Sequence, residues 1–255
     1  MISKQKKLLF GLLLAVSYSQ EVKWMSIGDL HNWYSAAGCE IEVGRTGQVS
    51  DQQDGLRYPA FYRVQDNQAA KGLWLGAANF HDPVVNKDYE YKVVHAGPRH
   101  LDIENETIPV EMTMDGKYDH PNVFVDGDPA TNLKYLDAVD NVDPNLPSDR
   151  RINNTVQTSI GVQMKRTVYA FSHPEHQNYH IQEYVFTNNG CFDKDCNTSY
   201  EQTLEGFQVY LQYRYAISRE GMVYDGGWLP QSAAWGHNTM NDVIGEHPDA
   251  PTEND

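Results

Sequence analysis

Positive charge is scarce in this sequence, and the common catalytic motifs are missing. Lysine and arginine total 20 against 35 aspartate and glutamate residues, which gives a formal net charge of −15. A chain this acidic repels phosphate backbones and anionic lipid, and no run of basic residues offsets the negative charge. Nucleic acids and membrane surfaces are therefore disfavoured as partners. The Gly-x-Ser-x-Gly motif, a phosphate-binding loop, the dinucleotide glycine fingerprint and paired Cys-x-x-Cys motifs are absent from the sequence. The sequence therefore names no reaction.

Long apolar runs are also missing, apart from a short stretch at the N-terminus. Residues 1–7 carry three lysines, residues 8–16 are apolar, and the small residues Ser17 and Ser19 occupy the positions that define a cleavage site. A membrane-spanning helix needs roughly twenty apolar residues, about twice the length of this stretch. We predict that residues 1–19 are a secretory signal peptide and that residues 20–255 form a single β-rich extracellular domain without membrane insertion.

Cysteine is rare, with three residues in the chain. Cys191 and Cys196 enclose four residues in a turn-like segment, and an oxidising compartment favours a disulfide across so short a loop. We predict a disulfide between them. Cys39 is then a buried thiol, because no activating cysteine–histidine motif lies near it. Pairing of Cys39 with either of the other two cysteines is the alternative.

The dominant hydrophobic period is two, which is typical of half-buried strands. Apolar and polar residues alternate over residues 156–171, and similar runs cover residues 179–186 and 207–215. We predict three consecutive strands in an antiparallel meander or Greek key. Weaker strands are predicted over residues 56–64, 72–78, 91–95 and 108–114. The predicted fold is mainly β, an antiparallel β-sandwich with one short helix and long acidic loops.

The short helix is predicted after Asp128. This residue is an N-cap candidate, Pro129 follows at the first helical position, and Leu133 and Leu136 then fall on one face. The proline-rich residues 143–149 are predicted to form a surface loop joining the N-terminal half to the meander.

Acidic residues concentrate in loops rich in glycine, asparagine and proline. Asp137, Asp140 and Asp143 offer the hard oxygen ligands that calcium prefers, although no loop matches the EF-hand pattern. Solvated acidic loops are one interpretation, and structural calcium at these three residues is the other. The same acids could supply the carboxylate pair of a glycosidase.

A group of histidines lies between two of the predicted strands. His173, Glu175, His176 and His180 contain ligand types found in zinc sites. Pro174 prevents the helix that would align them, and the order is not His-Glu-x-x-His. We therefore interpret this segment as a polar hairpin turn.

The chain holds five tryptophans and sixteen tyrosines, enough to build a sugar-stacking surface. Trp228 and Trp235 lie in a glycine-rich stretch and are the candidate glycan contacts, with core packing as the alternative. We expect Trp24, Trp33 and Trp74 to lie in the core.

Several segments resemble the N-terminal region of large uncharacterised secreted proteins of Bacteroidota-like and related marine bacteria, which often carry a C-terminal sorting domain for type IX secretion. The segments are residues 32–40 (NWYSAAGCE), 51–60 (DQQDGLRYPA), 73–76 (LWLG), 92–99 (KVVHAGPR) and 183–190 (EYVFTNNG). The resemblance implies extracellular β-rich structure. Because no sorting domain follows, we expect the chain to be the N-terminal part of a longer protein.

Two classes of function fit these observations. The first is a secreted, non-catalytic extracellular module with a structural, adhesive or binding role toward extracellular or cell-surface material, polysaccharide included. The second is a carbohydrate-active enzyme or its sugar-binding portion, which the loop acids and the aromatic residues support.

Overall fold

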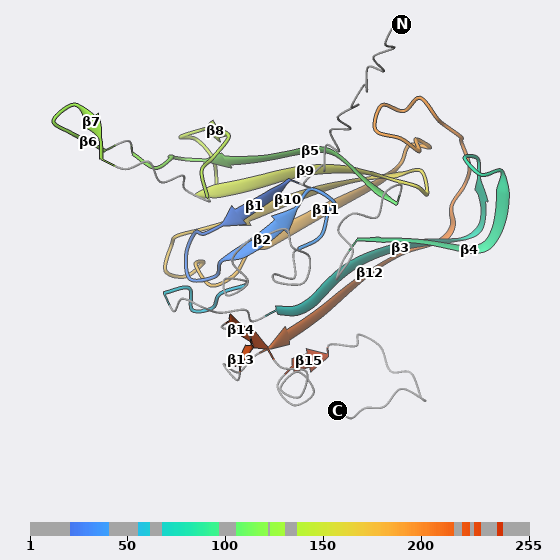
Figure 1. The fold of residues 1–255 in the computed structure, drawn as a ribbon. Helices are drawn as coiled ribbons and strands as arrows, with labels where there is room; N and C mark the ends of the chain where they lie inside the picture. The colour runs from blue at the N-terminus through green and yellow to red at the C-terminus, as the bar shows by residue number, and fades with distance from the viewer. Residues whose placement is uncertain are drawn as a thin grey trace, which may run out of the picture.

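The computed structural model describes residues 21–40, 56–61, 68–96, 106–121, 123–130, 137–216, 221–224, 227–230 and 239–241. The fold is mainly β, and its antiparallel sheets pack in a sandwich-like arrangement (Figure 1), which confirms the predicted class. The predicted signal peptide lies outside the described residues.

Two sheets form the body of the molecule. The larger has the order β11-β10-β9-β5-β8 and is antiparallel except for the parallel β5–β8 pair. Its strands are β5 (Thr107–Gly116), β8 (Asn141–Val142), β9 (Arg150–Thr158), β10 (Val162–Ala170) and β11 (Ile181–Asn188). The smaller sheet has the order β15-β12-β3-β4. Its strands are β3 (Gln68–Asp82), β4 (Lys87–Ala96), β12 (Glu205–Ala216) and β15 (Thr239–Asn241).

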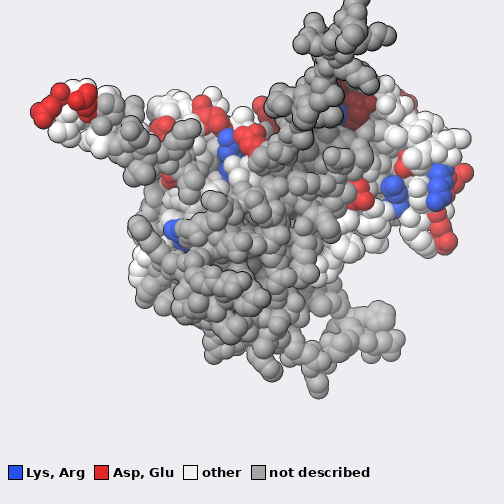
Figure 2. All heavy atoms as spheres, in the orientation of Figure 1, with Lys and Arg blue, Asp and Glu red and all other residues white. Residues whose placement is uncertain are grey.

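Three small hairpins complete the described strands. β1 (Val22–Met25) pairs with β2 (Asn32–Ser35), and this hairpin lies in front of β9 and β10 in Figure 1. β13 (Gly221–Tyr224) pairs with β14 (Gly227–Pro230). β6 (Phe124–Val125) pairs with β7 (Asp128–Pro129) at the far left of Figure 1, and acidic side chains gather at its tip (Figure 2).

The inner face of the larger sheet is covered in two parts. One apolar cluster joins it to the β1–β2 hairpin, and a second joins it to β3 and β4. The first contains Met25, Ile27, Tyr34, Ala36, Met112, Met114, Ile152, Val168 and Ala170. The second contains Leu73, Leu75, Phe80, Val94, Val156, Ile160, Val162, Met164 and Phe192. Removing this apolar surface from water is the main force that holds the layers together.

Polar side chains occupy the inward positions between these clusters. Arg166 on β10 lies opposite Asn154 on β9, and its Nη2 donates to the carbonyl oxygen of Ser35 at 2.8 Å and to Oδ1 of Asn154 at 3.1 Å. The nearby buried Glu40 accepts a 2.9 Å hydrogen bond from the side-chain amide of Gln182. Hydrogen bonds of this kind offset the cost of burying polar groups.

The predicted strand over residues 156–171 is two strands. Its alternation continues across a turn at residues 159–161, where Gly161 has φ +71° and Thr158 Oγ1 donates to the carbonyl oxygen of Val162 at 2.7 Å. β9, β10 and β11 form a meander, but the predicted one consisted of residues 156–171, 179–186 and 207–215 and is wrong in its strand composition. The third predicted strand, now β12, instead pairs with β3 in the other sheet.

The weaker strand predictions differ in outcome. Residues 72–78, 91–95 and 108–114 lie within β3, β4 and β5, which confirms them. Residues 56–61 form no strand, because Arg57 makes an isolated bridge to His31 and the Ala60 amide donates to the Asp29 carbonyl oxygen at 2.8 Å. These contacts tie the segment to the β1–β2 turn. Residues 62–64 lie outside the described residues.

The helix prediction is wrong where the structure tests it. Asp128 and Pro129 form β7, antiparallel to β6, and the intervening Asp126 and Gly127 have φ +54° and +91°. An Asp-Gly pair with two positive φ angles is typical of a tight hairpin turn, so Asp128 leads into a strand and is not a helix N-cap. No helix occurs in the described part of the chain. Leu133 and Leu136 lie outside it.

Candidate functional site

The outer face of the smaller sheet carries the candidate site. Along β3 the side chains alternate, so Leu73 and Leu75 are buried while Trp74 between them is 40% exposed. The prediction that Trp74 belongs to the core is therefore wrong. Its two leucine neighbours take the inward positions, and the period of two turns the indole outward.

Aromatic rings from three strands form a row across this face. Trp74 lies opposite Tyr210 on β12 and opposite His95 on β4. The centroid of the Trp74 ring is 6.2 Å from that of Tyr210 and 5.5 Å from that of His95. Tyr210 is 53% exposed, so the row presents ring surface to solvent. We call Tyr210, Trp74 and His95 the ring row.

Polar and small residues border the ring row. Glu106 holds His95 in place, since its Oε2 lies 2.9 Å from His95 Nδ1 and accepts a 3.0 Å hydrogen bond from the His95 amide. Gln208 lies on the same face of β12 as Tyr210. It is opposite Gly76, the next residue after Trp74 on the outer face of β3, and Gly76 has no side chain. Gly76 therefore adds no side chain of its own beside the indole, and Gln208 places an amide group on the same face of the sheet.

A separate cavity of about 410 Å³ opens between the ends of β11 and β12. Its apolar walls include Phe186 and Phe207, whose ring centroids are 6.1 Å apart. Asn188 at the rim donates to the carbonyl oxygen of Gln202 at 2.9 Å. This hydrogen bond links the end of β11 to the segment that leads into β12.

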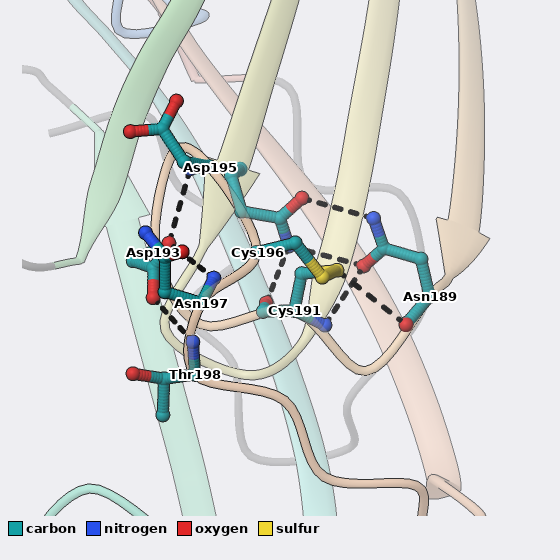
Figure 3. Close-up of a disulfide and its surroundings, with 8 residues drawn as sticks. Asn189, Cys191, Asp193, Asp195, Cys196, Asn197 and Thr198 are labelled. Atoms are coloured by element: carbon teal, nitrogen blue, oxygen red, sulfur yellow. Dashed lines mark hydrogen bonds between the residues drawn. A yellow bond between two sulfur atoms is a disulfide. The ribbon is translucent and has the colours of Figure 1, made fainter.

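The predicted disulfide is present between Cys191 and Cys196, just after β11 (Figure 3). Asp193 lies inside the closed loop, and its carboxylate accepts hydrogen bonds from the amides of Asn197 and Thr198 at 2.9 and 2.6 Å. These backbone hydrogen bonds hold the pKa of Asp193 below its ordinary value. Figure 3 shows the carboxylate directed back toward the loop, so its charge organises the turn.

Cys39 lies outside this disulfide, as predicted, and is a buried thiol. It packs with Trp24, Trp33, Ala37 and Ala96. Trp24 and Trp33 are 5% and 6% exposed, which confirms that both belong to the core.

The three residues predicted to bind calcium have protein partners. Asp137 accepts a hydrogen bond from Ser26, and its Oδ1 lies 2.6 Å from His120 Nε2. Asp140 contacts the Lys23 ammonium at 2.9 Å and accepts a 2.6 Å hydrogen bond from the Met114 amide.

Asp143 accepts a 2.9 Å hydrogen bond from the amide of Asn145 in its own turn. Among the described residues, Asp137, Asp140 and Asp143 do not form a group of ligand atoms close enough to share one ion. The geometry assigns them to local structure, and calcium binding stays a prediction.

The side chains of the two predicted glycan contacts lie outside what the structure describes. Trp228 lies in β14, opposite Val223 on β13, and its side chain lies outside the described residues. Trp235 lies outside them altogether. Among the described residues a different tryptophan, Trp74, is exposed on a sheet face. The sequence pattern that could have identified it is its position between two leucines, Leu73 and Leu75, in a strand with a period of two.

The outer face of the larger sheet carries a polar network. Asp115 on β5 accepts hydrogen bonds from Arg151 and Asn153 at 2.8 Å, and from Asn141 at 3.0 Å. Burial raises the pKa of Asp115, but the hydrogen bonds from Arg151 and Asn141 outweigh it, and the pKa lies below its ordinary value. This carboxylate is therefore held in its charged form.

No known protein family, no curated protein and no solved structure matches this chain. No helix among the described residues has the length and apolar character needed to cross a membrane. The resemblance to the N-terminal region of large secreted bacterial proteins remains an expectation.

Proposed function

We propose that this protein is a secreted, non-catalytic extracellular module that binds polysaccharide through the ring row of the smaller sheet. The observation that carries the proposal is the alignment of the exposed Tyr210 and Trp74 and the half-buried His95 in one row on three paired strands. Aromatic rings pack against the apolar faces of sugar rings, and a sheet holds such rings at fixed spacing.

The chemistry around the ring row favours recognition of a neutral or cationic sugar chain. Glu106 and Gln208 supply hydrogen-bonding groups near the rings, and sugar hydroxyls both donate and accept. The net charge of −15 opposes a strongly anionic polymer. The rings and the amide therefore suit a glycan that stacks and hydrogen-bonds on an open surface.

Export to an oxidising compartment is part of the proposal. The N-terminal sequence pattern supports it, and the Cys191–Cys196 disulfide is compatible with it. N-terminal sequencing of secreted protein tests the predicted start at Gln20; material that still begins at Met1 contradicts it.

Affinity electrophoresis of the mature chain through gels containing soluble glucans, xylans or mannans tests the binding function. We expect at least one polymer to retard the protein, and Trp74→Ala to weaken that binding at least ten-fold, because truncation of a central aromatic contact removes most of its stacking surface. Phe124→Ala is the matched control, since Phe124 is 60% exposed but lies on the β6–β7 hairpin.

Equal binding by the two variants, or no retardation by any polymer, contradicts the proposal. An assay for released reducing ends on the same polymers addresses the alternative, a carbohydrate-active enzyme. Hydrolysis that a single carboxylate substitution abolishes favours the enzyme.

A further inference from the structure

The turn between β10 and β11 brings three metal-ligating side chains together. His173, Glu175 and His176 each offer a ligand atom, and these atoms lie within 4.8 Å of one another. All three side chains are exposed, and the two imidazole centroids are 5.6 Å apart. From the sequence we predicted a polar hairpin turn here in place of a metal site. The turn is present, and it is the turn that gathers the ligands.

The turn is anchored at both ends. Before the ligands, Asp149 Oδ2 accepts hydrogen bonds from the amide and hydroxyl of Ser172 at 2.6 and 2.9 Å. After them, the carbonyl oxygen of Gln177 accepts from the Asp29 amide at 2.6 Å. Gly28 packs so closely on Gln177 that no Cβ fits there. The backbone that carries the ligands is therefore fixed before an ion arrives, which reduces the entropy lost on binding.

A hydrogen bond to Tyr179 also prepares one ligand. Nδ1 of His176 contacts the Tyr179 hydroxyl, so the other ring nitrogen, Nε2, points away from this bond. A hydrogen bond at one imidazole nitrogen fixes the ring and the tautomer that binds metal through the other. His180 is not part of this group of ligand atoms; its Nδ1 lies 2.8 Å from the hydroxyl of Tyr34.

We propose that His173, Glu175 and His176 bind a divalent transition-metal ion, with zinc the best match. Two imidazoles and one carboxylate suit zinc far better than calcium or magnesium, which prefer oxygen ligands. Ligand atoms around a tetrahedral zinc lie about 3.4 Å apart, and rotation of exposed side chains closes the distance from 4.8 Å. Three protein ligands leave a position open for water or for a donor from bound material.

Isothermal titration of the mature chain with zinc chloride tests this site, with millimolar calcium and magnesium present to saturate non-specific acidic positions. We expect one zinc per chain, and His173→Ala or His176→Ala to weaken binding at least ten-fold. His81→Ala is the matched control, because His81 is also surface-accessible but contacts Asp88 on the β3–β4 hairpin. Equal zinc affinity in the His176→Ala and His81→Ala variants overturns the proposal.

Two further measurements separate a built site from adventitious binding. Cobalt(II) in place of zinc should give the visible absorption of a low-symmetry site in the wild-type protein and in His81→Ala, and lose it in His176→Ala. Tyr179→Phe removes the hydroxyl that positions His176 and should weaken zinc binding several-fold. Circular dichroism of each variant confirms that its fold is intact, and a cobalt spectrum unchanged in His176→Ala overturns the assignment.

Discussion

The two faces of the smaller sheet use adjacent residues for different purposes. On the inner face, Leu73 and Leu75 pack with Val94 against the larger sheet; on the outer face, Trp74 and Tyr210 remain accessible. Neighbours along β3 therefore differ in what their loss would do. Inner side chains supply stability, and we propose that outer ones supply binding, so single substitutions can separate the two contributions.

The largest expected effect is on the inner face. Leu75→Ala removes a side chain that is 2% exposed, and we expect the free energy of unfolding to fall by about 2–5 kcal/mol because a cavity remains in the core. Urea denaturation measures this. Trp74→Ala should cost less than about 1.5 kcal/mol, since it removes ring contacts on the surface. An equal loss in both variants would break the comparison between the faces.

The disulfide loop packs against the inner face of the smaller sheet, and we expect its loss to have the second-largest effect on the free energy of unfolding. Phe192 follows Cys191 and packs within 6.4 Å of the Phe80 ring, measured between centroids. Replacing both disulfide cysteines by serine should lower the free energy of unfolding by about 2 kcal/mol, the value for closing so short a loop. Glycan binding should persist, because the ring row lies on the other face. Binding lost together with the disulfide would contradict the separation.

The pH dependence of the free energy of unfolding tests whether the outer face of the larger sheet also contributes to stability. The pKa of Asp115 lies below its ordinary value of 3.8, so its contribution is present above that value and is lost as the pH falls through the folded-state pKa. Asp115→Asn should lower the free energy of unfolding by on the order of 1 kcal/mol at pH 7. Denaturation curves between pH 7 and pH 3 should show this difference shrinking, and a constant difference would exclude the carboxylate's charge as the cause.

The smallest expected change is at the rim of the ring row. Tyr210→Phe keeps the ring and removes only an exposed hydroxyl, so the free energy of unfolding should change by less than about 0.5 kcal/mol. Glycan affinity should fall less than three-fold, whereas Tyr210→Ala should weaken it further. Calorimetry with the retarding polymer measures both. Equal affinities of the Phe and Ala variants would show that the Tyr210 ring takes no part.

The fold class and most strands could be predicted because burial on one side of a sheet leaves a period of two in the sequence. The turn inside residues 156–171 left no such mark. Val156 pairs with Met164, so even-numbered residues face inward on both strands and the alternation passes through the hairpin unbroken. The change of sheet at β12 was equally hidden, because alternation shows which side of a strand is buried and not which strand is its neighbour.

The candidate site was predictable only in part. The order Leu73, Trp74, Leu75 already implied an outward indole, but its alignment with Tyr210 and His95 depends on the register of three strands far apart in the chain.

The helix prediction failed for a local reason. Asp126-Gly127 is a hairpin-turn sequence, and it outweighed Asp128-Pro129 as a helix start.

The open end of the smaller sheet has a consequence for how the protein behaves at high concentration. Among the described strands β4 is one edge of this sheet, and the outward backbone groups of an edge strand can pair with a strand from another molecule. Lys87 and Lys92 lie over the ring of Tyr89 at 4.6 and 4.8 Å, and charged side chains surround this end of the β3–β4 hairpin in Figure 2. A strand that paired with β4 would have to desolvate these ammonium groups, so the charges oppose edge-to-edge pairing between molecules.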